Sequence, residues 1–574
     1  MSSKNRPGKM VLVPRLVQCL REYTVADLSR DLIAGLTVGL VALPLAMAFG
    51  IASGVTPQAG IYTAVVAGFL ISALGGSRMQ IGGPTGAFVV IVAGIIARHG
   101  ISGLLMVTLM AGVILVVMGI TGLGAAVKFI PRPVTIGFTN GIALLIASTQ
   151  IKDFLGLRTP PLSSEFFGRM KALITHIGTV NGLTFAVALT SLAVILVIPR
   201  FTKRIPGSII ALFLATALTA LLHLPIETVG SKYGGIPSGL PPFAAPAFRV
   251  DLIIPLLPSA ITVALLAAVE SLLSAVVADG MSGDKHNSNM ELVAQGIANI
   301  ITPLFGGIPA TGAIARTATN VRAGARSPMA GIIHALTLLL ILVAAAPVAR
   351  FIPLATLAAV LFVVAYNMGE WREIAVIMRL SKADKAVWIT TFALTVAADL
   401  TVAVEVGMVL ASLLYIHRVS QTTTVSRVTE EYIKDGQAHI LQDKYVPPYV
   451  SILRIHGPFL FGTTDKLAEE THDLDQFAPV VVLRLRNMTA LDATGLHSLV
   501  ELSRRLHNSG RTLLLCGSRN QPQELMERSD FRAVVGVDNI LPNVEAALNR
   551  ARDVYESFGG MGGDIAQDHS RLPV

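Results

Sequence analysis

The chain has 574 residues, of which 53% are hydrophobic and only 14% are charged. A soluble domain carries about 25% charged residues, so this composition excludes a chain that faces water throughout. The formal net charge of +9 comes from basic residues scattered between apolar runs. A nucleic-acid-binding surface would concentrate them on one face, so we expect no nucleic acid as a partner.

Apolar runs of membrane-helix length recur between Leu32 and His417 and predict an all-α polytopic membrane domain. A helix needs about 20 residues to cross the hydrocarbon core of a bilayer, and several runs are shorter than this. The two shortest follow Gly83 and Gly312. The fourteen runs are residues 32–51, 57–75, 85–97, 102–122, 134–151, 181–198, 206–224, 252–278, 291–304, 312–323, 328–348, 351–367, 386–399 and 401–417.

The distribution of Lys and Arg predicts the orientation in the membrane. Six basic residues precede the first run, and further groups within 128–132, 200–204 and 372–385 fall in every second set of loops. The positive-inside rule makes these loops and the N-terminus cytoplasmic, and an even number of crossings places the C-terminus there too. The segment 152–176 carries four basic residues on the opposite side, but a longer loop counts less in this rule.

The first thirty residues are polar and basic and lack the layout of a cleaved signal peptide, so we expect the first membrane helix to remain in place. The two cysteines, Cys19 and Cys516, are far apart and have no metal-ligand spacing. We therefore expect neither a disulfide nor a metal site.

After Arg418 the composition becomes that of a soluble domain. Strand-like runs alternate with helical patterns, which predicts a small α/β domain. The strands are expected at 449–455, 480–486 and 512–518, and the helices at 464–472, 494–508, 521–529 and 543–553. We expect five parts: a cytoplasmic N-terminal segment (1–30), a transmembrane domain (31–418), a linker (419–447), the α/β domain (448–555) and a disordered Gly-rich tail (556–574).

Two of the short runs begin with nearly the same phrase. Residues 82–87 read GGPTGA and residues 306–313 read GGIPATGA, and both stand where a membrane helix should begin. Paired interrupted helices at matching positions of two halves are the signature of an inverted-repeat transporter. The alternative is that each phrase marks an ordinary kink, since Gly and Pro are common in membrane helices. The repetition favours the first interpretation.

The phrase also explains how an anion could be held. Gly-Gly-Pro lets an extended segment run to mid-membrane, where Pro is tolerated in the first turn of a half-helix. The first N–H groups then point unpaired into the interior, and each such end supplies about half a positive charge. Thr85 and Thr311 can add hydroxyl donors, and Gly86 and Gly312 let an anion approach the backbone. We predict an anion between two half-helix N-termini.

Glu270 lies near the middle of the run 252–278, with no other charge within eight residues on either side. A carboxylate inside a membrane is costly, so it must be protonated, be paired or line a water-filled site. Ser274 lies one turn further on the same helix face. We predict that Glu270, together with Ser274, couples transport to protons or shapes the anion site. A structural acid tied to a neighbouring helix is the alternative.

Two more residues are candidates for the site. Arg316 lies one turn past Gly312 and could raise the local positive potential. Alternatively, it is an ordinary helix-surface arginine near the cytoplasm, because Arg322 and Arg326 follow it. Phe49 either forms a wall of the site or is a core aromatic.

The sequence contains no nucleophile–base set and no metal constellation, so we expect neither an enzyme nor a cofactor. Four histidines are isolated, have no metal-ligand spacing and are interpreted as structural or loop residues. They are His99, His223, His286 and His334.

These features together are similar to those of a known family. GGPTGAF, the phrase DKHNSNMELVAQGIANIITPLFGGIPATGAIARTATN (284–320) and the C-terminal α/β pattern resemble the sulfate permease family of anion transporters, over residues 20–550. The resemblance implies a uracil-permease-like fold of two inverted seven-segment repeats, in a homodimer in the bacterial inner (plasma) membrane. The first four segments of each repeat would form a core unit that moves like an elevator against a gate unit.

The resemblance also implies which residues surround the anion. Besides Glu270, the matching positions are Phe49, Thr85, Gly86, Ala87, Ala313, Ile314, Ala315 and Arg316. The position of Leu45 is polar in animal relatives, so no side-chain contact is expected there. Sodium-coupled bicarbonate relatives carry Asp where this chain has Glu270, which favours protons over sodium as the coupling ion.

The C-terminal domain resembles the STAS domain of sulfate transporters and anti-sigma-factor antagonists. In the antagonists, a Ser or Thr at a helix start is phosphorylated, and the segment 488–499 (MTALDATGLHSL) puts Thr494 at that place. A helix N-terminus favours a phosphate group. Capping of the helix by Asp492 or Thr494 is the alternative.

We therefore expect secondary active transport of a small anion, sulfate or a similar oxyanion, coupled to protons. One alternative is bicarbonate or C4-dicarboxylate transport by the same fold. Another is a membrane-anchored signalling protein whose C-terminal domain binds partners. The expected partners are the anion, the coupling ion, membrane lipid and a second copy of the chain.

Overall fold

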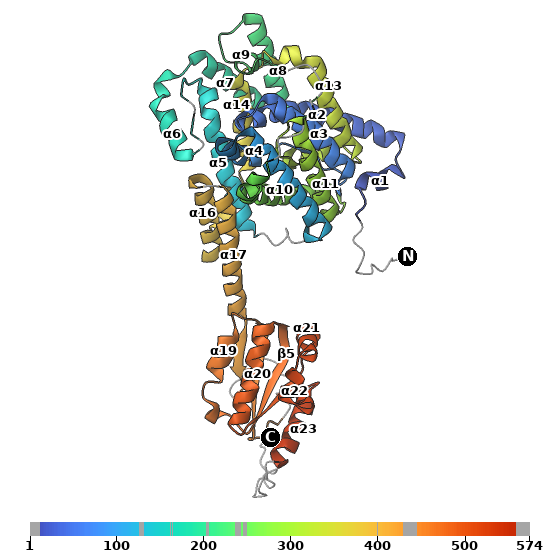
Figure 1. Cartoon of the computed structure of the whole chain (residues 1–574), viewed down its shortest axis with the longest axis vertical. Helices are drawn as coiled ribbons and strands as arrows, with labels where there is room; N and C mark the ends of the chain where they lie inside the picture. Colours follow the sequence, from blue (N-terminus) through green and yellow to red (C-terminus); the bar gives the residue numbers. More distant parts are fainter. Residues whose placement is uncertain are drawn as a thin grey trace. The chain divides into compact units, whose positions relative to one another are not determined.

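The computed structural model describes residues 12–124, 131–160, 162–163, 165–201, 206–235, 241, 243–244, 249–398, 400–428 and 445–557. The chain divides into two compact units, Met1–Ala411 and Ser412–Val574, each drawn in Figure 1. The expected tail from Phe558 onward and most of the expected linker lie outside the described residues.

The first unit is helical and contains two repeats of seven membrane segments. The first repeat consists of α2 (Val25–Ala52), α3 (Pro57–Leu74), α4 (Gly86–Ile120), α5 (Arg132–Leu155), α7 (Gly182–Phe201) and α8 (Gly207–Leu222). Here α4 provides two segments, because Gly100 has φ 68° and breaks the helix. The second repeat consists of α10 (Ile253–Ser282), α11 (Ser288–Ile301), α12 (Ile314–Arg322), α13 (Met329–Ala349), α14 (Leu354–Met368), α16 (Lys382–Ala397) and α17 (Leu400–Thr422).

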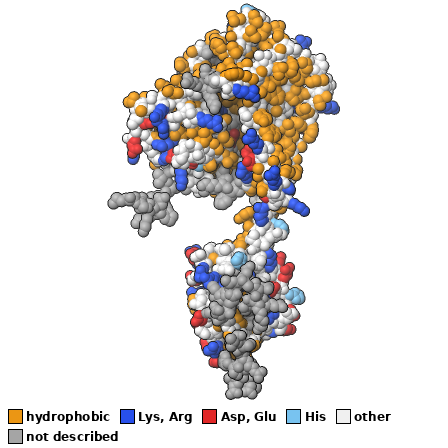
Figure 2. All heavy atoms as spheres, turned by 180° about the vertical axis from the view of Figure 1, so that it is seen from behind, with side chains coloured by type: hydrophobic (Ala, Val, Ile, Leu, Met, Phe, Trp, Pro, Cys, Tyr) orange, Lys and Arg blue, Asp and Glu red, His pale blue; other side chains and the backbone are white. Residues whose placement is uncertain are grey.

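All fourteen predicted runs coincide with these segments. Seven described helices are long and apolar enough to cross a membrane by themselves. The short helix α1 (Arg15–Leu20) precedes the first span, and three short helices connect later spans: α6 (Phe166–Thr175), α9 (Val229–Tyr233) and α15 (Trp371–Ile377). Large apolar side chains such as Phe213, Leu221 and Ile254 are exposed, and Figure 2 shows that hydrophobic side chains dominate the visible face of this unit. Such a surface requires lipid around it.

The helices of the first unit pack in two groups. In one group α4 packs on α10 and α11, and α13 packs on α2 and α3. In the other, α5 packs on α14 and α16, and α7 packs on α8 and α14. The first helix of each repeat thus contacts the fourth segment of the other, as α2 does with α13. Small residues allow close crossings: a Cβ added to Gly296 of α11 would lie 2.6 Å from the carbonyl oxygen of Gly112 in α4.

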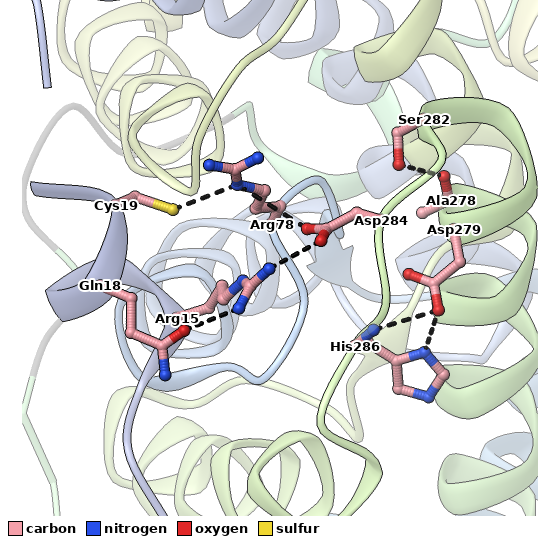
Figure 3. Close-up of polar contacts among 9 residues, drawn as sticks. All are labelled: Arg15, Gln18, Cys19, Arg78, Ala278, Asp279, Ser282, Asp284 and His286. Atoms are coloured by element: carbon pink, nitrogen blue, oxygen red, sulfur yellow. Dashed lines mark hydrogen bonds and ion pairs between the residues drawn. The ribbon is translucent and has the colours of Figure 1, made fainter. Parts of the chain in front are cut away.

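At one end of this unit, charged side chains tie the N-terminal helix α1 to two loops (Figure 3). Arg15 is 2.7 Å from Asp284, which follows α10, and its backbone N–H donates to the carbonyl of Gly75, which follows α3. The side chain of Arg78 lies between Cys19 and Asp284, with its Nε 3.4 Å from the Cys19 sulfur. The segment that leads into α4 is therefore held on two sides.

The start of α2 differs from the prediction. The helix begins at Val25, seven residues before the predicted run, with a capping box between Thr24 and Asp27. Asp31, which is fully buried, accepts hydrogen bonds from the backbone of Arg326 and from Ser327. Charged residues lower the mean hydropathy of a segment, so the first turns of α2 did not appear apolar. In the folded chain a buried charge such as that of Asp31 is compensated by hydrogen-bond partners.

The second unit is an α/β domain with a five-stranded sheet in the order β3-β4-β5-β6-β7. β4 (Val450–Phe459), β5 (Val480–Leu491), β6 (Thr512–Cys516) and β7 (Ile540–Leu541) are parallel, and β3 (Thr424–Arg427) is antiparallel to β4. One sheet face packs against α19 (Thr464–Glu470), α20 (Ala493–Asn508), α21 (Asn520–Arg528) and α22 (Phe531–Val535). The other packs against α23 (Val544–Ser557).

The predicted boundary between the membrane domain and the linker needs correction. The helix α17 continues to Thr422, and β3 lies inside the stretch 419–447 that was expected to be linker. The segment TVSR of β3 is short and three of its four residues are polar, so its role as an edge strand depends on pairing with β4 rather than on its own composition.

Candidate functional site

The two repeated phrases meet inside the first unit. Gly82 and Gly83 form the short strand β1, which pairs antiparallel with β2, formed by Thr311 and Gly312. The backbone N–H of Ala313 extends the contact by donating to the carbonyl of Ile81. Because α4 follows β1 and α12 follows β2, two helices of opposite repeats begin at one hydrogen-bonded junction.

No side chain caps either helix at this junction. The N-cap residues are Thr85 for α4 and Ala313 for α12, and neither side chain accepts a hydrogen bond from the first turn. The first turn of α4 also contains no acidic residue. The partial positive charge of each helix N-terminus is therefore not neutralised by the helix itself.

Glycine is required where the backbone passes other groups closely. Gly83 has φ +149°, and a Cβ there would lie 2.5 Å from Nη1 of Arg316. A Cβ on Gly312 would lie 1.8 Å from Nε2 of Gln80. The close approach of Gln80 thus explains why position 312 needs a glycine. The contact of Gly312 with an anion stays a prediction. A Cβ on Gly86 would meet Phe49, Ile146 and Met368 at 3.0–3.3 Å.

One face of α10 holds both strands through polar contacts. The Thr85 hydroxyl donates to Oε2 of Glu270 at 2.8 Å, and the Thr311 hydroxyl donates to the Ala267 carbonyl at 2.9 Å. One turn further, Ser271 accepts from Gln80 at 2.7 Å. Glu270, Ser271 and Ser274 recur at helical spacing, so they form one polar stripe on an apolar helix, and the Ala267 carbonyl lies on the same face.

Ser274 belongs to this stripe but contacts α12 rather than Glu270. Its hydroxyl donates to Oγ1 of Thr317 at 3.0 Å, and Thr317 also accepts the backbone N–H of Ile81. Ser274 therefore positions the second half-helix against β1. The coupling role predicted for it remains a prediction.

Arg316 is buried and crosses between the repeats. Its Nη2 donates to the carbonyl of Pro84, immediately before the first half-helix. This contact differs from an ordinary helix-surface arginine, because the guanidinium lies in the protein interior and adds a full positive charge beside the two helix N-termini.

The predicted site residues differ in their exposure. Phe49, Ala87 and Ala313 are buried, and Phe49 is close to Gly86. Ile314 and Ala315, in the first turn of α12, are exposed, and Glu270 is partly exposed. The first turn of α12 and Glu270 are therefore the less buried parts of the candidate site.

Sequence reasoning missed several residues of this region. Ile146 of α5 and Met368 of α14 lie beside Gly86, so the second helix group contributes to the site's wall. Gln80, Ser271 and Thr317 tie the strands to α10 and α12. The polar spacing of Ser271 with Glu270 and Ser274 was a usable signal, whereas nothing in the sequence marks Ile146 or Met368 among many similar apolar residues.

The predicted phosphorylation residue lies in the second unit, in the first turn of α20. Asp492 is the N-cap and accepts the N–H of Gly495 at 2.8 Å, so the capping role expected for Asp492 or Thr494 belongs to Asp492. Thr494 itself is exposed. Its phosphorylation remains a prediction.

Comparison with known proteins identifies the family. The model of the sulfate permease family matches residues 28–391, and that of the STAS domain matches residues 442–547. The chain belongs to the sulfate permease family. This is a family of transporters, and membership makes the chain a multi-pass membrane protein with a C-terminal STAS domain.

Individual relatives extend over nearly the whole chain. YvdB of Bacillus subtilis, whose assignment as a sulfate transporter is provisional, is 43% identical over 517 residues, covering 90% of this chain and 96% of YvdB. The bicarbonate transporter BicA of Synechocystis is 30% identical over 557 residues, covering 93% of this chain and 96% of BicA.

Solved structures show the same fold. The overall structure of SLC26A9 superimposes with a TM-score of 0.83 at 18% identity, covering 96% of this chain and 94% of that one. The transmembrane domain of a cyanobacterial BicA superimposes with a TM-score of 0.60 at 31% identity, covering 68% of this chain and 98% of that domain. The sulfate permease member described here therefore has the expected architecture of two inverted seven-segment repeats.

Proposed function

We propose that this sulfate permease member is a secondary active transporter of a small oxyanion such as sulfate, coupled to protons. The observation that carries the proposal is the β1–β2 junction, where two uncapped helix N-termini begin side by side next to a buried arginine. Two helix ends supply about half a positive charge each, and Arg316 supplies a whole one. Together these charges can stabilise an anion inside the membrane domain.

We assign the anion to the space between the first turns of α4 and α12. The N–H groups in the first turns of α4 and α12 would bind it, with Gly86 and Ala87 on one side and Ile314 and Ala315 on the other. Phe49 would wall the site, and Gly312, Ala313 and Arg316 would complete its second half. The proposed domain organisation keeps transport in the first unit and assigns regulation to the STAS domain.

Glu270 is proposed as the coupling group. It faces the junction, its carboxyl receives the Thr85 hydroxyl, and the next residues of the stripe hold both strands. A proton bound to this carboxyl would offset part of the negative charge of the bound anion. Movement of α10 together with both strands would then carry the proton and the anion across the membrane together. The packing of the helices in two groups supports an elevator-like displacement of the group with α4 and α10 against the group with α5 and α14.

Bicarbonate is the second candidate substrate, because relatives named as bicarbonate transporters match over nearly the full chain. Sulfate is preferred because the relative with 43% identity is assigned to sulfate.

The proposal is tested by flux into proteoliposomes of the purified full chain. Labelled sulfate should accumulate when a proton gradient is imposed, more than with an equal sodium gradient, and unlabelled sulfate should compete better than bicarbonate or succinate. The Glu270→Gln variant should still bind sulfate but lose the dependence on the proton gradient. Absence of flux for all three anions would contradict transport and favour a sensor. Unchanged proton dependence in Glu270→Gln would remove the coupling role.

A further inference from the structure

His334 is a buried imidazole that the proposed transport mechanism does not yet use. It lies on α13 and is fully buried, and neither ring nitrogen has a hydrogen-bond partner among the described residues. The backbone of Gly331, one turn earlier, interacts with the ring without reaching hydrogen-bond geometry. A neutral imidazole has one N–H and one acceptor nitrogen, and leaving both unpaired in the interior costs free energy.

The ring lies against the strand that leads into the first half-helix. A Cβ added to Gly68 of α3 would be 3.2 Å from the carbonyl oxygen of Gly82 in β1 and 3.5 Å from Cε1 of His334. Because Gly68 has no side chain, the imidazole can lie close to β1. This contact places a polar side chain of α13 next to the backbone of the β1–β2 junction.

Arg316 approaches the same strand one turn earlier on α3, near Ala64. A Cβ on Gly83 would lie 2.5 Å from Nη1 of Arg316 and 3.4 Å from Cα of Ala64. Since Ala64 and Gly68 are four residues apart on one helix face, the guanidinium and the imidazole are neighbours along that face.

The guanidinium has one arm paired and one arm unpaired. Nη2 donates to the Pro84 carbonyl, whereas Nη1 is buried and has no partner among the described residues. A buried charged donor without an acceptor is more costly than a neutral one. On this face of α3, Nη1 of Arg316 is without an acceptor and the His334 ring is without a partner, and the two groups do not hydrogen-bond to each other directly among the described residues.

We propose that His334 is a positioning residue for Arg316, with one bridging water that accepts a hydrogen bond from Nη1 and donates one to Nε2 of His334. The ring then keeps its proton on Nδ1, on the side of the Gly331 carbonyl. Both arms of the guanidinium are fixed, one on Pro84 and one on α13, so Arg316 acts on the anion by its charge from a set position. This inference rests on the proposed function, because it assigns the orientation of a site residue.

Side-chain isosteres of the two ring nitrogens give a sharp test. The amide of glutamine reaches the place of Nε2, whereas that of asparagine reaches only the place of Nδ1. In proteoliposome flux of labelled sulfate, His334→Gln should keep a KM near the wild-type value. His334→Asn and His334→Leu should raise KM by about tenfold or more, as expected for losing a charge-assisted hydrogen bond. A lower kcat with unchanged KM would contradict a positioning role.

Coupling to Arg316 distinguishes positioning from a general packing role. In the double variant His334→Leu with Arg316→Lys, KM should be no higher than in Arg316→Lys alone, because the lysine cannot make both contacts. If the rise of KM in the double variant equalled the product of the rises in the two single variants, the two residues would act independently and the proposal would be overturned. Ser72→Ala is the matched control: Ser72 is buried on the same face of α3 and has no hydrogen-bond partner in the described part of the chain, but it faces Gly331. Ser72→Ala should leave KM unchanged. If it raised KM as much as His334→Leu does, the loss of any buried polar group at this face would explain the effect, and the proposal would be overturned.

A spectroscopic measurement separates this inference from the proposed function. In nitrogen-15 NMR of histidine-labelled protein, the signal lost in His334→Gln should report a proton on Nδ1 and an acceptor Nε2, and Nε2 should shift in Arg316→Lys. A proton on Nε2 would overturn the inference even if transport is normal. If the expected spectrum were found but no anion were transported, the inference about His334 would be supported and the proposed function would be contradicted.

Discussion

At the scale of single residues, Thr85 connects the first half-helix to α10. Its hydroxyl does not cap its own helix but donates to the Glu270 carboxyl. This arrangement leaves the first turn of α4 free for a ligand and gives Glu270 one defined partner. Thr85 therefore links the N-terminus of the first half-helix to the carboxyl that we propose for coupling through one hydrogen bond.

Replacing Thr85 by Val should impair transport more than replacing it by Ser. Val preserves the shape but removes the donor, and hydrogen bonds to charged groups contribute about 1.5–3 kcal/mol, so kcat/KM should fall about tenfold or more. Thr85→Ser keeps the hydroxyl and should stay near wild type. Both are measured by initial rates of sulfate uptake. Equal rates for Val and Ser would mean that this hydrogen bond has no role in transport.

Cys516 of β6 should be an unreactive thiol in the folded STAS domain. Burial raises the pKa of the Cys516 thiol to about 11, with Arg484 acting in the opposite direction. Since thiolate is the reactive form, a Cys19→Ser variant, whose remaining cysteine is Cys516, should react slowly with Ellman's reagent at pH 8 and rapidly in denaturant. An unfolded thiol ionises near pH 9, so the folded domain should lose stability as pH rises from about 9 to about 11. Fast labelling without denaturant would contradict the burial.

The sequence identified some site residues and missed others for physical reasons. Thr85 and Arg316 follow from the repeated phrase, and Glu270 stands out because a lone carboxyl in an apolar run needs a partner. His334 is fully buried, but a single histidine in a helix carries no periodic signal, and its neighbour on α3 is a glycine. Partners that come from separate helices, such as Gln80 with Ser271, depend on the tertiary fold.

At the scale of elements, the crossing of α4 and α11 depends on two glycines in mutual contact. A Cβ on Gly112 would lie 2.7 Å from the Gly296 carbonyl oxygen, and a Cβ on Gly296 would lie 2.6 Å from that of Gly112. Both contacts involve backbone, which cannot rotate away, so the two helices would have to separate.

Gly296→Ala should therefore destabilise the membrane unit by about 1–3 kcal/mol, the usual cost of overpacking. Gly280→Ala in α10 is the control, because a Cβ there meets nothing within 4 Å and alanine favours a helix. Thermal unfolding in detergent, followed by circular dichroism, compares the two. A melting temperature for Gly296→Ala at or above that of Gly280→Ala would contradict the tight crossing.

Hydropathy predicted the membrane segments well, because lipid imposes a minimum length and apolarity on each of them. It placed the start of α2 too late, since Asp27, Arg30 and Asp31 interrupt the apolar run although Asp31 is paired in the fold. It also missed α6 and β3, because short amphipathic elements are stabilised by their neighbours rather than by their own composition.

At the scale of the whole molecule, the second unit has its own apolar core on both faces of its sheet. The sequence predicted this unit from the alternation of strands and helices. It did not predict that the sheet takes its edge strand β3 from upstream of residues 429–444. A parallel sheet with β4 exposed at its edge would offer unpaired backbone groups to other chains.

A fragment of residues 423–557 should therefore fold alone and unfold cooperatively in urea. A fragment of residues 445–557, which lacks β3, should unfold at lower urea and associate at high concentration, because the β4 edge is uncovered. Tryptophan is absent from both fragments, so circular dichroism and size-exclusion chromatography are the measurements. Identical urea midpoints and elution volumes would show that β3 does not stabilise the domain.

The pairing of β1 with β2 has a consequence for biosynthesis. The residues of β1 leave the ribosome long before those of β2, yet their backbone partners lie in the other repeat. Until Thr311 and Gly312 have been translated, the peptide groups ahead of α4 have no strand to bind within the bilayer, where unpaired backbone is costly. The first half of a nascent chain must therefore wait at the insertion machinery in a provisional arrangement, and chains truncated before residue 311 should be cleared by quality control.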